Sequence, residues 1–186
     1  MKASEMRPGM AFIKDGQLYV CTTATHVTPG NLRAFVQAKL RRLSDGTTIE
    51  KRLRSTEDVE QAFLDRREME FLYSDKSSHV FMDNETYDQL TVSDALLGDS
   101  IKYFKPNTPV VALTHDGNIV SLELPKSVDL KVTDTTPMAK GATVTNQMKD
   151  AVLETGLRIR VPPFIEVGEL VRVNTEDGSY GGRAKG

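Results

Sequence analysis

Residues 35–48 read FVQAKLRRLSDGTT, and this stretch decides the fold that the sequence predicts. Residues 35–43 have the composition of a β-strand, and the Asp45-Gly46 pair that follows is the strongest short-range signal for a tight hairpin. The same pair recurs at residues 15–16, 116–117 and 177–178, each time between segments rich in Val, Ile, Leu, Thr and Tyr. The sequence therefore predicts a mainly β fold built from hairpins.

Further strands are predicted between and after these pairs. Met69, Phe71 and Tyr73 occupy alternate positions before a Ser-rich turn, and a second strand follows at residues 80–82. Towards the C-terminal end, residues 157–161 and 170–173 place charge on alternate positions, as half-buried strands do. Many short strands over the whole length indicate small barrels or sandwiches in series.

Charge is distributed unevenly along these modules. Residues 1–62 carry ten Lys or Arg against seven Asp or Glu, residues 63–125 carry five against eleven, and residues 126–186 carry nine against eight. The change near residue 62 and the junction at residues 124–126 predict three domains, 1–62, 63–125 and 126–186. Each domain is near the lower size limit for an independent core, so we expect the three to pack on one another.

Helix signals are short. Ser93 can cap a helix that Gly98 stops, which predicts one or two turns between them. Residues 55–63 leave a helix open, because Thr56 can cap it but the segment is too short to decide. Residues 145–154 are either weakly helical or an irregular loop across a barrel end.

Groups suited to catalysis or metal binding are scarce. His26, His79 and His115 are far apart in sequence, and the single cysteine, Cys21, has the character of a small apolar strand residue. The chain contains no phosphate-binding glycine loop, dinucleotide-binding turn or nucleophile elbow. We therefore expect neither an enzyme nor a metal or other cofactor. Since no apolar run is long enough for a membrane span or a signal peptide, we expect a cytoplasmic protein.

One segment stands out as a binding surface. Pro29-Gly30 is a turn dipeptide, Asn31 tolerates a left-handed backbone and a strand resumes after Ala34, which predicts a hairpin tip. The tip exposes Leu32 where an ordinary turn is polar, and residues 26–54 carry seven basic residues against two acidic ones. Such a surface suits an RNA backbone, and the alternative is a plain surface turn of mixed charge. The predicted tip residues are Pro29, Gly30, Asn31, Leu32, Arg33 and Ala34, and the predicted basic patch contains Lys39, Arg41, Arg42, Lys51, Arg52 and Arg54.

Three stretches of the chain resemble the elongation factor P family, and together they cover nearly its whole length. The first contains Pro29-Gly30, Ala34-Phe35, Lys39-Leu40-Arg41 and Glu50-Lys51, and the second, residues 82–90, reads MDNETYDQL. The third is the most specific and contains, at fixed spacing, Thr155-Gly156-Leu157, Val161-Pro162, Phe164-Ile165, Gly168-Glu169, Val171, Val173, Thr175, Gly178, Tyr180 and Arg183. So many matched positions make chance agreement negligible.

The resemblance implies an SH3-like, KOW-type N-terminal barrel followed by two OB-fold barrels, arranged in a tRNA-like L shape. It also implies a translation elongation factor that binds the ribosome between the peptidyl-tRNA and exit sites and relieves stalling at consecutive prolines. The implied partners are the ribosome, peptidyl-tRNA, ribosomal RNA and, in the exit site, messenger RNA, and we expect a monomer. Such a factor fixes the geometry of the peptidyl-tRNA, which requires no catalytic group on the protein.

Two positions depart from the family pattern. Many members carry a modifiable Lys or Arg where this chain has Asn31, so we expect an unmodified tip, and the alternative is a modification of Arg33 or another tip group in a shifted geometry. In the third domain, Ala142 replaces an acidic residue in the loop that the resemblance directs at messenger RNA. The residues expected to contact RNA and the small subunit in this domain are Gly141, Thr143, Tyr180 and Arg183.

Two other interpretations share the predicted fold. A paralogue of the family would serve a different stalling motif, since paralogues differ mainly at the tip. A generic OB-fold RNA-binding protein would need aromatic stacking platforms, whereas this chain has 6% aromatic residues and no tryptophan.

Overall fold

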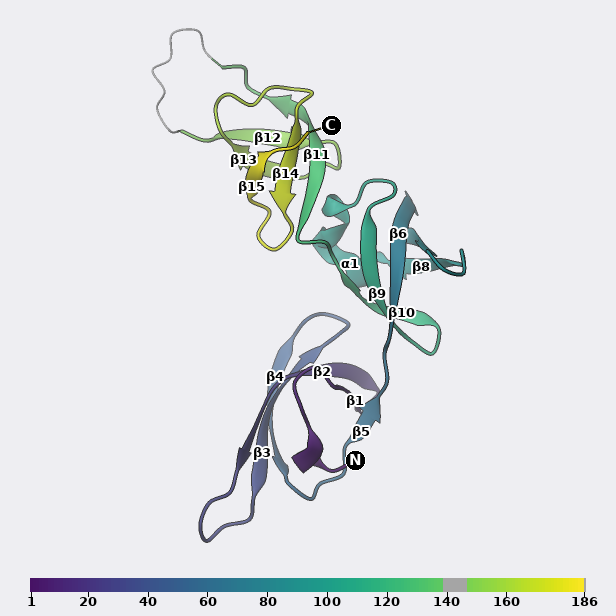
Figure 1. Cartoon of the computed structure of the whole chain (residues 1–186), viewed down its shortest axis with the longest axis vertical. Coiled ribbons are helices and arrows are strands. Elements are labelled where there is room, and N and C mark those ends of the chain that lie inside the picture. Colours follow the sequence, from purple (N-terminus) through teal and green to yellow (C-terminus); the bar gives the residue numbers. More distant parts are fainter. Residues whose placement is uncertain (139–146, 186) are drawn as a thin grey trace. The chain divides into compact units, whose positions relative to one another are not determined.

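The computed structural model describes residues 1–138 and 147–185, and within them the chain is built mainly from β-strands. These strands form three five-stranded sheets that follow one another along the chain (Figure 1). The predicted mainly β fold is thereby confirmed.

The first sheet has the strand order β4-β3-β2-β1-β5. The strands are β1 (Ala11–Lys14), β2 (Gln17–Val27), β3 (Phe35–Arg42), β4 (Thr48–Arg54) and β5 (Glu60–Ala62), and a short 3-10 helix, η1 (Ala3–Glu5), precedes them. Strands β2 and β3 run side by side over eight residue pairs, from Tyr19 opposite Arg42 to Val27 opposite Phe35. The inner face of the sheet covers an apolar core that includes Met6, Phe12, Cys21, Val36, Ala38 and Leu40.

The second sheet has the strand order β10-β9-β6-β7-β8. Its strands are β6 (Asp65–Asp75), β7 (Ser78–Asp83), β8 (Gln89–Ser93), β9 (Pro109–His115) and β10 (Asn118–Glu123). The short helix α1 (Asp94–Leu97) and the 3-10 helix η2 (Gly98–Tyr103) follow β8. The rings of Phe71, Phe81 and Phe104 lie 5.4–5.6 Å apart between centroids and form an aromatic cluster.

The third sheet has the strand order β13-β12-β11-β14-β15. Its strands are β11 (Ser127–Thr135), β12 (Lys149–Leu153), β13 (Arg158–Val161), β14 (Leu170–Asn174) and β15 (Tyr180–Arg183). Alternate apolar residues of these strands, together with Ile165 from the segment between β13 and β14, form a compact core that includes Leu130, Val132, Leu153, Val161, Val171 and Val173.

The chain divides into two compact units, Met1–Arg67 with Ala112–Leu122, and Glu68–Val111 with Glu123–Gly186. Each of the three sheets falls within one of the ranges 1–62, 63–125 and 126–186. The division into three domains at these boundaries stays a prediction.

The short-helix predictions have different outcomes. The helix expected between Ser93 and Gly98 is confirmed as α1, and Gly98 at its C-terminal end has a φ of 53°. Residues 55–63 contain no helix, because residues 60–62 pair with β1 as β5. The prediction for residues 145–154 is wrong for residues 149–153, which form β12 between β11 and β13. Pairing of residues 149–153 with β11 and β13 overrides a weak local preference for helix.

His79 has a structural role in the second sheet. Its ring is almost fully buried, and its Nδ1 lies 2.7 Å from the Ser74 hydroxyl. Its Nε2 contacts the carboxylate of Asp94 at the start of α1. Because both ring nitrogens have partners, burial of this histidine leaves no polar atom unsatisfied.

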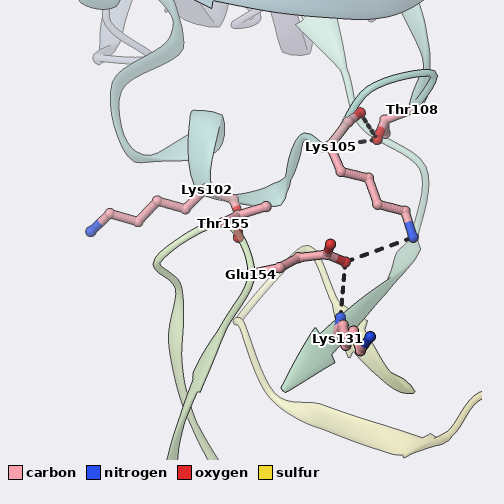
Figure 2. Close-up of polar contacts among 6 residues, drawn as sticks. All are labelled: Lys102, Lys105, Thr108, Lys131, Glu154 and Thr155. Atoms are coloured by element: carbon pink, nitrogen blue, oxygen red, sulfur yellow. Dashed lines mark hydrogen bonds and ion pairs between the residues drawn. The ribbon is translucent and has the colours of Figure 1, made fainter. Parts of the chain in front are cut away.

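Within the second unit, the turn between β12 and β13 is bound to η2 and the residues after it (Figure 2). The Thr155 hydroxyl donates a hydrogen bond to the carbonyl oxygen of Lys102. The Glu154 carboxylate accepts the backbone N–H of Lys131 at 2.9 Å and lies 3.9 Å from the Lys105 ammonium. One short turn therefore contacts both η2 and the first strand of the third sheet.

The turn between β14 and β15 approaches η2 at Gly178. A Cβ atom at this position would lie 3.0 Å from the Tyr103 hydroxyl, and the φ of Gly178 is +73°. Both the backbone conformation and the close approach therefore favour glycine here.

We expect Gly178→Ala to destabilise its turn by more than Gly46→Ala does. Both glycines have a φ of +73°, but a Cβ at Gly46 meets nothing within 4 Å. The left-handed backbone alone costs about 1–2 kcal/mol in each variant. The additional loss of stability in Gly178→Ala would come from the close contact of the new Cβ with the Tyr103 hydroxyl. Adding Tyr103→Phe should therefore restore most of this additional loss. Local free energies of opening from amide hydrogen exchange measure this, and an excess that persists in the double variant would contradict the explanation.

Candidate nucleic-acid interface

The predicted tip connects β2 to β3 through a tight turn. The backbone N–H of Leu32 donates to the carbonyl oxygen of Pro29 at 3.3 Å, which closes a four-residue turn. Neither Gly30 nor Asn31 is among the residues with positive φ, so the turn does not use a left-handed residue. The turn makes no use of the tolerance of Asn31 for a left-handed backbone, so its backbone conformation does not require asparagine.

The turn presents its side chains outward. Leu32 is 73% exposed. Arg33 is also exposed, and within the described part of the chain it has no ion pair or hydrogen bond from its side chain. The base of the tip is fixed, because the Ser55 backbone N–H donates to the Ala34 carbonyl at 3.2 Å. The base of the tip is therefore fixed by a backbone hydrogen bond, whereas Leu32 and Arg33 at its end are exposed. Such an arrangement suits contact with a partner.

The pairing of β3 with β4 separates the predicted basic patch into two faces. Successive residues of a strand point to opposite faces, and Gln37 lies opposite Arg52 while Ala38 lies opposite Lys51. Lys51 is therefore on the inner face with Ala38, and the six predicted cations do not form one surface. The cations on the solvent side, here called the outer face, are Lys39, Arg41, Arg52 and Arg54.

Two of the predicted cations are engaged within the protein. The Lys39 ammonium lies 3.2 Å from the Glu50 carboxylate, directly across from it on β4. Arg42 donates to Asp45 at 2.9 Å and to the Tyr19 hydroxyl at 3.4 Å. The contact with Tyr19 raises the pKa of Arg42, and the Thr47 backbone N–H, followed by the charge of Arg42, lowers the pKa of Asp45. The Arg42 side chain is therefore bound within the protein, by Asp45 of its own hairpin turn and by Tyr19 of β2.

Arg52 has an aromatic partner that the sequence did not reveal. The Arg52 guanidinium carbon lies 3.7 Å from the centroid of the Phe35 ring, within the range of a cation–π contact. Phe35 lies opposite Arg54, so Arg52 reaches it diagonally across the two strands. This contact depends on the register between β3 and β4, which composition alone does not specify.

Two of the residues predicted for the third domain, Tyr180 and Arg183, lie in the part of the chain that the structure describes. Tyr180 packs against the core of the third sheet, and burial raises its pKa. The Arg183 guanidinium lies 3.0 Å from the Glu169 carboxylate and 4.7 Å from the Phe164 ring centroid. Their contact with the small subunit stays a prediction. Gly141 and Thr143, the other residues predicted in this domain, lie outside the described residues.

Features of other protein classes were also sought in residues 1–138 and 147–185. No three His, Cys, Asp or Glu side chains converge there in a way that could hold a metal ion. No helix among these residues is long and apolar enough to cross a membrane.

Three family models match this chain and together span most of it. They are described as the elongation factor P KOW-like domain at residues 2–59, the elongation factor P OB domain at residues 64–122, and elongation factor P, C-terminal, at residues 128–183.

Curated relatives agree over almost the full length of the chain. It is 44% identical over 182 residues to the elongation factor P of Acidobacterium capsulatum, with 98% of each protein covered. It is 45% identical over 183 residues to that of Bradyrhizobium diazoefficiens, covering 98% of this chain and 97% of the relative. The elongation factor P of Moorella thermoacetica is 44% identical over 184 residues, covering 99% of this chain and all of the relative.

Among solved structures, eukaryotic translation initiation factor 5A from Methanococcus jannaschii has a similar fold. The TM-score is 0.53 at 17% identity, covering 67% of this chain and 90% of that one. At this identity the likeness bears on the fold alone, and it agrees with the mainly β architecture of small barrel-like sheets.

We expect Gly30→Ala to leave the stability of the tip unchanged or to raise it by up to about 1 kcal/mol. The reason is that Gly30 lacks a positive φ and that an added Cβ meets nothing within 4 Å. Gly46→Ala, at a φ of +73°, is the matched control and should be destabilising. Amide exchange in β2 and β3 and the melting temperature measure the effect. A loss at Gly30 as large as that at Gly46 would show that the turn needs a left-handed residue after all.

Proposed function

The chain belongs to the elongation factor P family of translation factors, and from this premise we propose that it binds the ribosome beside the peptidyl-tRNA and stimulates peptide-bond formation at consecutive prolines. The observation that carries the proposal is the tip between β2 and β3. There an exposed Leu32 and an unpaired Arg33 stand on a base held by backbone hydrogen bonds, among the described residues.

The proposed mechanism is positional. Holding two reactants in the correct geometry removes much of the entropic barrier to their reaction, and effective molarities for oriented groups reach about 10⁵–10⁸ M. Proline has a fixed φ and a rigid ring, so a peptidyl-tRNA that ends in proline has few ways to reach the reactive geometry by itself. The tip would restrict the acceptor end of the tRNA, and the ribosome would supply the reaction.

The outer face of β3 and β4 supplies the electrostatic part of binding in this proposal. Arg41, Arg52 and Arg54 point to the solvent side of the sheet and form no ion pair within the described residues. Cations arranged in this way displace counterions from RNA phosphates, which favours binding and makes it sensitive to salt. Under this proposal the protein acts without a catalytic group, a metal or another cofactor of its own.

A reconstituted translation assay tests the function directly. A message that encodes three consecutive prolines is translated with and without the protein, and a message that lacks proline runs serves as the control. We expect faster synthesis of the proline message only. Acceleration of a different stalling motif with no effect on prolines would instead indicate a paralogue within the family. Intact mass of the added protein shows whether the tip carries a modification.

We expect Arg33→Ala to slow triple-proline synthesis more than Lys39→Ala. Arg33 is next to the exposed end of the tip and has no internal partner among the described residues, whereas Lys39 is paired with Glu50 at 3.2 Å. Lys39 also lies six positions further along the chain, most of them in β3, which places it about 20 Å from Arg33 at strand rise. The rate of tripeptide synthesis at saturating factor measures the difference. Equal and small effects would argue against a mechanism centred on the tip.

We expect unmodified Asn31→Lys to be no faster than the parent protein in the same assay. The backbone at this position does not require asparagine, so a change in the rate of synthesis would reflect contact of the tip with its RNA partner and not a change in the turn. A bare lysine adds a charge, but ordering its flexible side chain costs up to about 2 kcal/mol. Both proteins must be shown by mass to be unmodified. A clear acceleration by Asn31→Lys would mean that Asn31 marks a lost modification site.

A further inference from the structure

Arg52 makes a closer aromatic contact than Arg42, the other patch arginine that lies over a ring, whose guanidinium carbon is 5.7 Å from the Tyr19 ring centroid. Arg42 uses its N–H groups on Asp45 and Tyr19, and Lys39 is paired with Glu50. Arg52 instead lies with its guanidinium carbon 3.7 Å from the Phe35 ring centroid. A guanidinium stacked on a ring is held through its face, so its edge of five N–H donors remains available.

The contact lies at the tip end of the outer face. Phe35 is the first residue of β3 and directly follows the tip residues. Arg52 sits opposite Gln37 and leans diagonally onto Phe35, towards the turn. Arg52 is exposed and Phe35 is half-buried, so the ring is partly covered while the cation is in contact with solvent.

We propose that Phe35 is a positioning residue whose ring holds the Arg52 guanidinium edge outward to bind a phosphate diester of RNA. This inference rests on the proposed function and specifies how the outer face would contact its partner. The planar fork of arginine matches two phosphate oxygens, and a fork that is already oriented loses less freedom on binding. Lysine in the same place would supply charge without the fork.

Phosphate diesters near the tip can come from the peptidyl-tRNA or from ribosomal RNA, and the chemistry of recognition is the same for both. Binding to ribosomes that carry a P-site tRNA is therefore compared with binding to ribosomes that lack it. An effect of Phe35 that disappears without tRNA assigns the phosphate to tRNA, and one that persists assigns it to ribosomal RNA. Either result supports the inference.

The experiment measures the dissociation constant for ribosomes at several salt concentrations. The variants are Phe35→Leu, which removes the ring but keeps an apolar side chain, Phe35→Tyr, which keeps the ring, Arg52→Gln, Arg52→Lys, and the double variant Phe35→Leu with Arg52→Gln. Phe63→Leu is the matched control, because Phe63 is an exposed phenylalanine, 78% accessible, that takes part in none of the ring contacts of the described residues. Amide exchange in β3 and β4 verifies that the strands still pair.

We expect Phe35→Leu to weaken binding about two- to fivefold, which corresponds to an exposed cation–π contact. Phe35→Tyr and Phe63→Leu should bind like the parent protein. Arg52→Gln should weaken binding and reduce the slope of log affinity against log salt by about one, as expected for one lost phosphate contact. Arg52→Lys should keep that slope but lose affinity. In the Arg52→Gln background, Phe35→Leu should have no further effect.

A merely structural role for Phe35 gives a different result. Phe35→Leu would then weaken binding equally in the presence and absence of Arg52, together with faster exchange in β3 and β4. Additive effects of this kind, or normal binding by Phe35→Leu, would overturn the inference. The proposed function would still stand if the parent protein bound ribosomes in a salt-dependent way. Failure of the parent protein to bind ribosomes or to stimulate triple-proline synthesis would overturn both.

Discussion

The pairing of β2 with β3 is the constraint on which the candidate interface depends. It runs over eight residue pairs and ends at Val27 opposite Phe35, which leaves the chain to reverse direction within a few residues. The same strand β3 then sets the register of β4. Because side chains alternate between faces, a slip of one residue would exchange the buried residues Val36, Ala38 and Leu40 for the exposed cations. The apolar core of the first sheet therefore also fixes the direction of its arginines.

Local signals predicted much of the fold. Asp-Gly pairs marked turns, and Ser93 and Gly98 bounded a short helix, because turn and cap chemistry depends on neighbouring residues only. The signals failed where distant partners decide the structure. Residues 149–153 looked helical or irregular but form a strand between two others. Residue type gives a preference, and long-range pairing selects among the conformations that it allows.

The sequence predicted the hairpin at the tip, but not how its cations are arranged. The excess of basic residues between His26 and Arg54 made this hairpin the candidate site. It could not show that Lys51 faces inward, that Glu50 neutralises Lys39, or that an aromatic ring supports an arginine across the strand. Each of these facts depends on register, which is set by non-local hydrogen bonding. A count of charges therefore overstates the number of cations that one ligand can contact at once.

The turn at the tip has a consequence for how variation at this site can be detected. Since neither Gly30 nor Asn31 is held in a special backbone conformation and their surroundings are open, folding imposes little selection on which side chains stand there. Deep mutational scans that score cellular abundance will be nearly blind to this loop, as will filters that discard variants by their thermal stability. Among natural sequences the loop can diverge without compensating changes elsewhere in the barrel. The residues found in this loop therefore reflect selection by the surface that it binds, and they carry little information about the fold of the barrel.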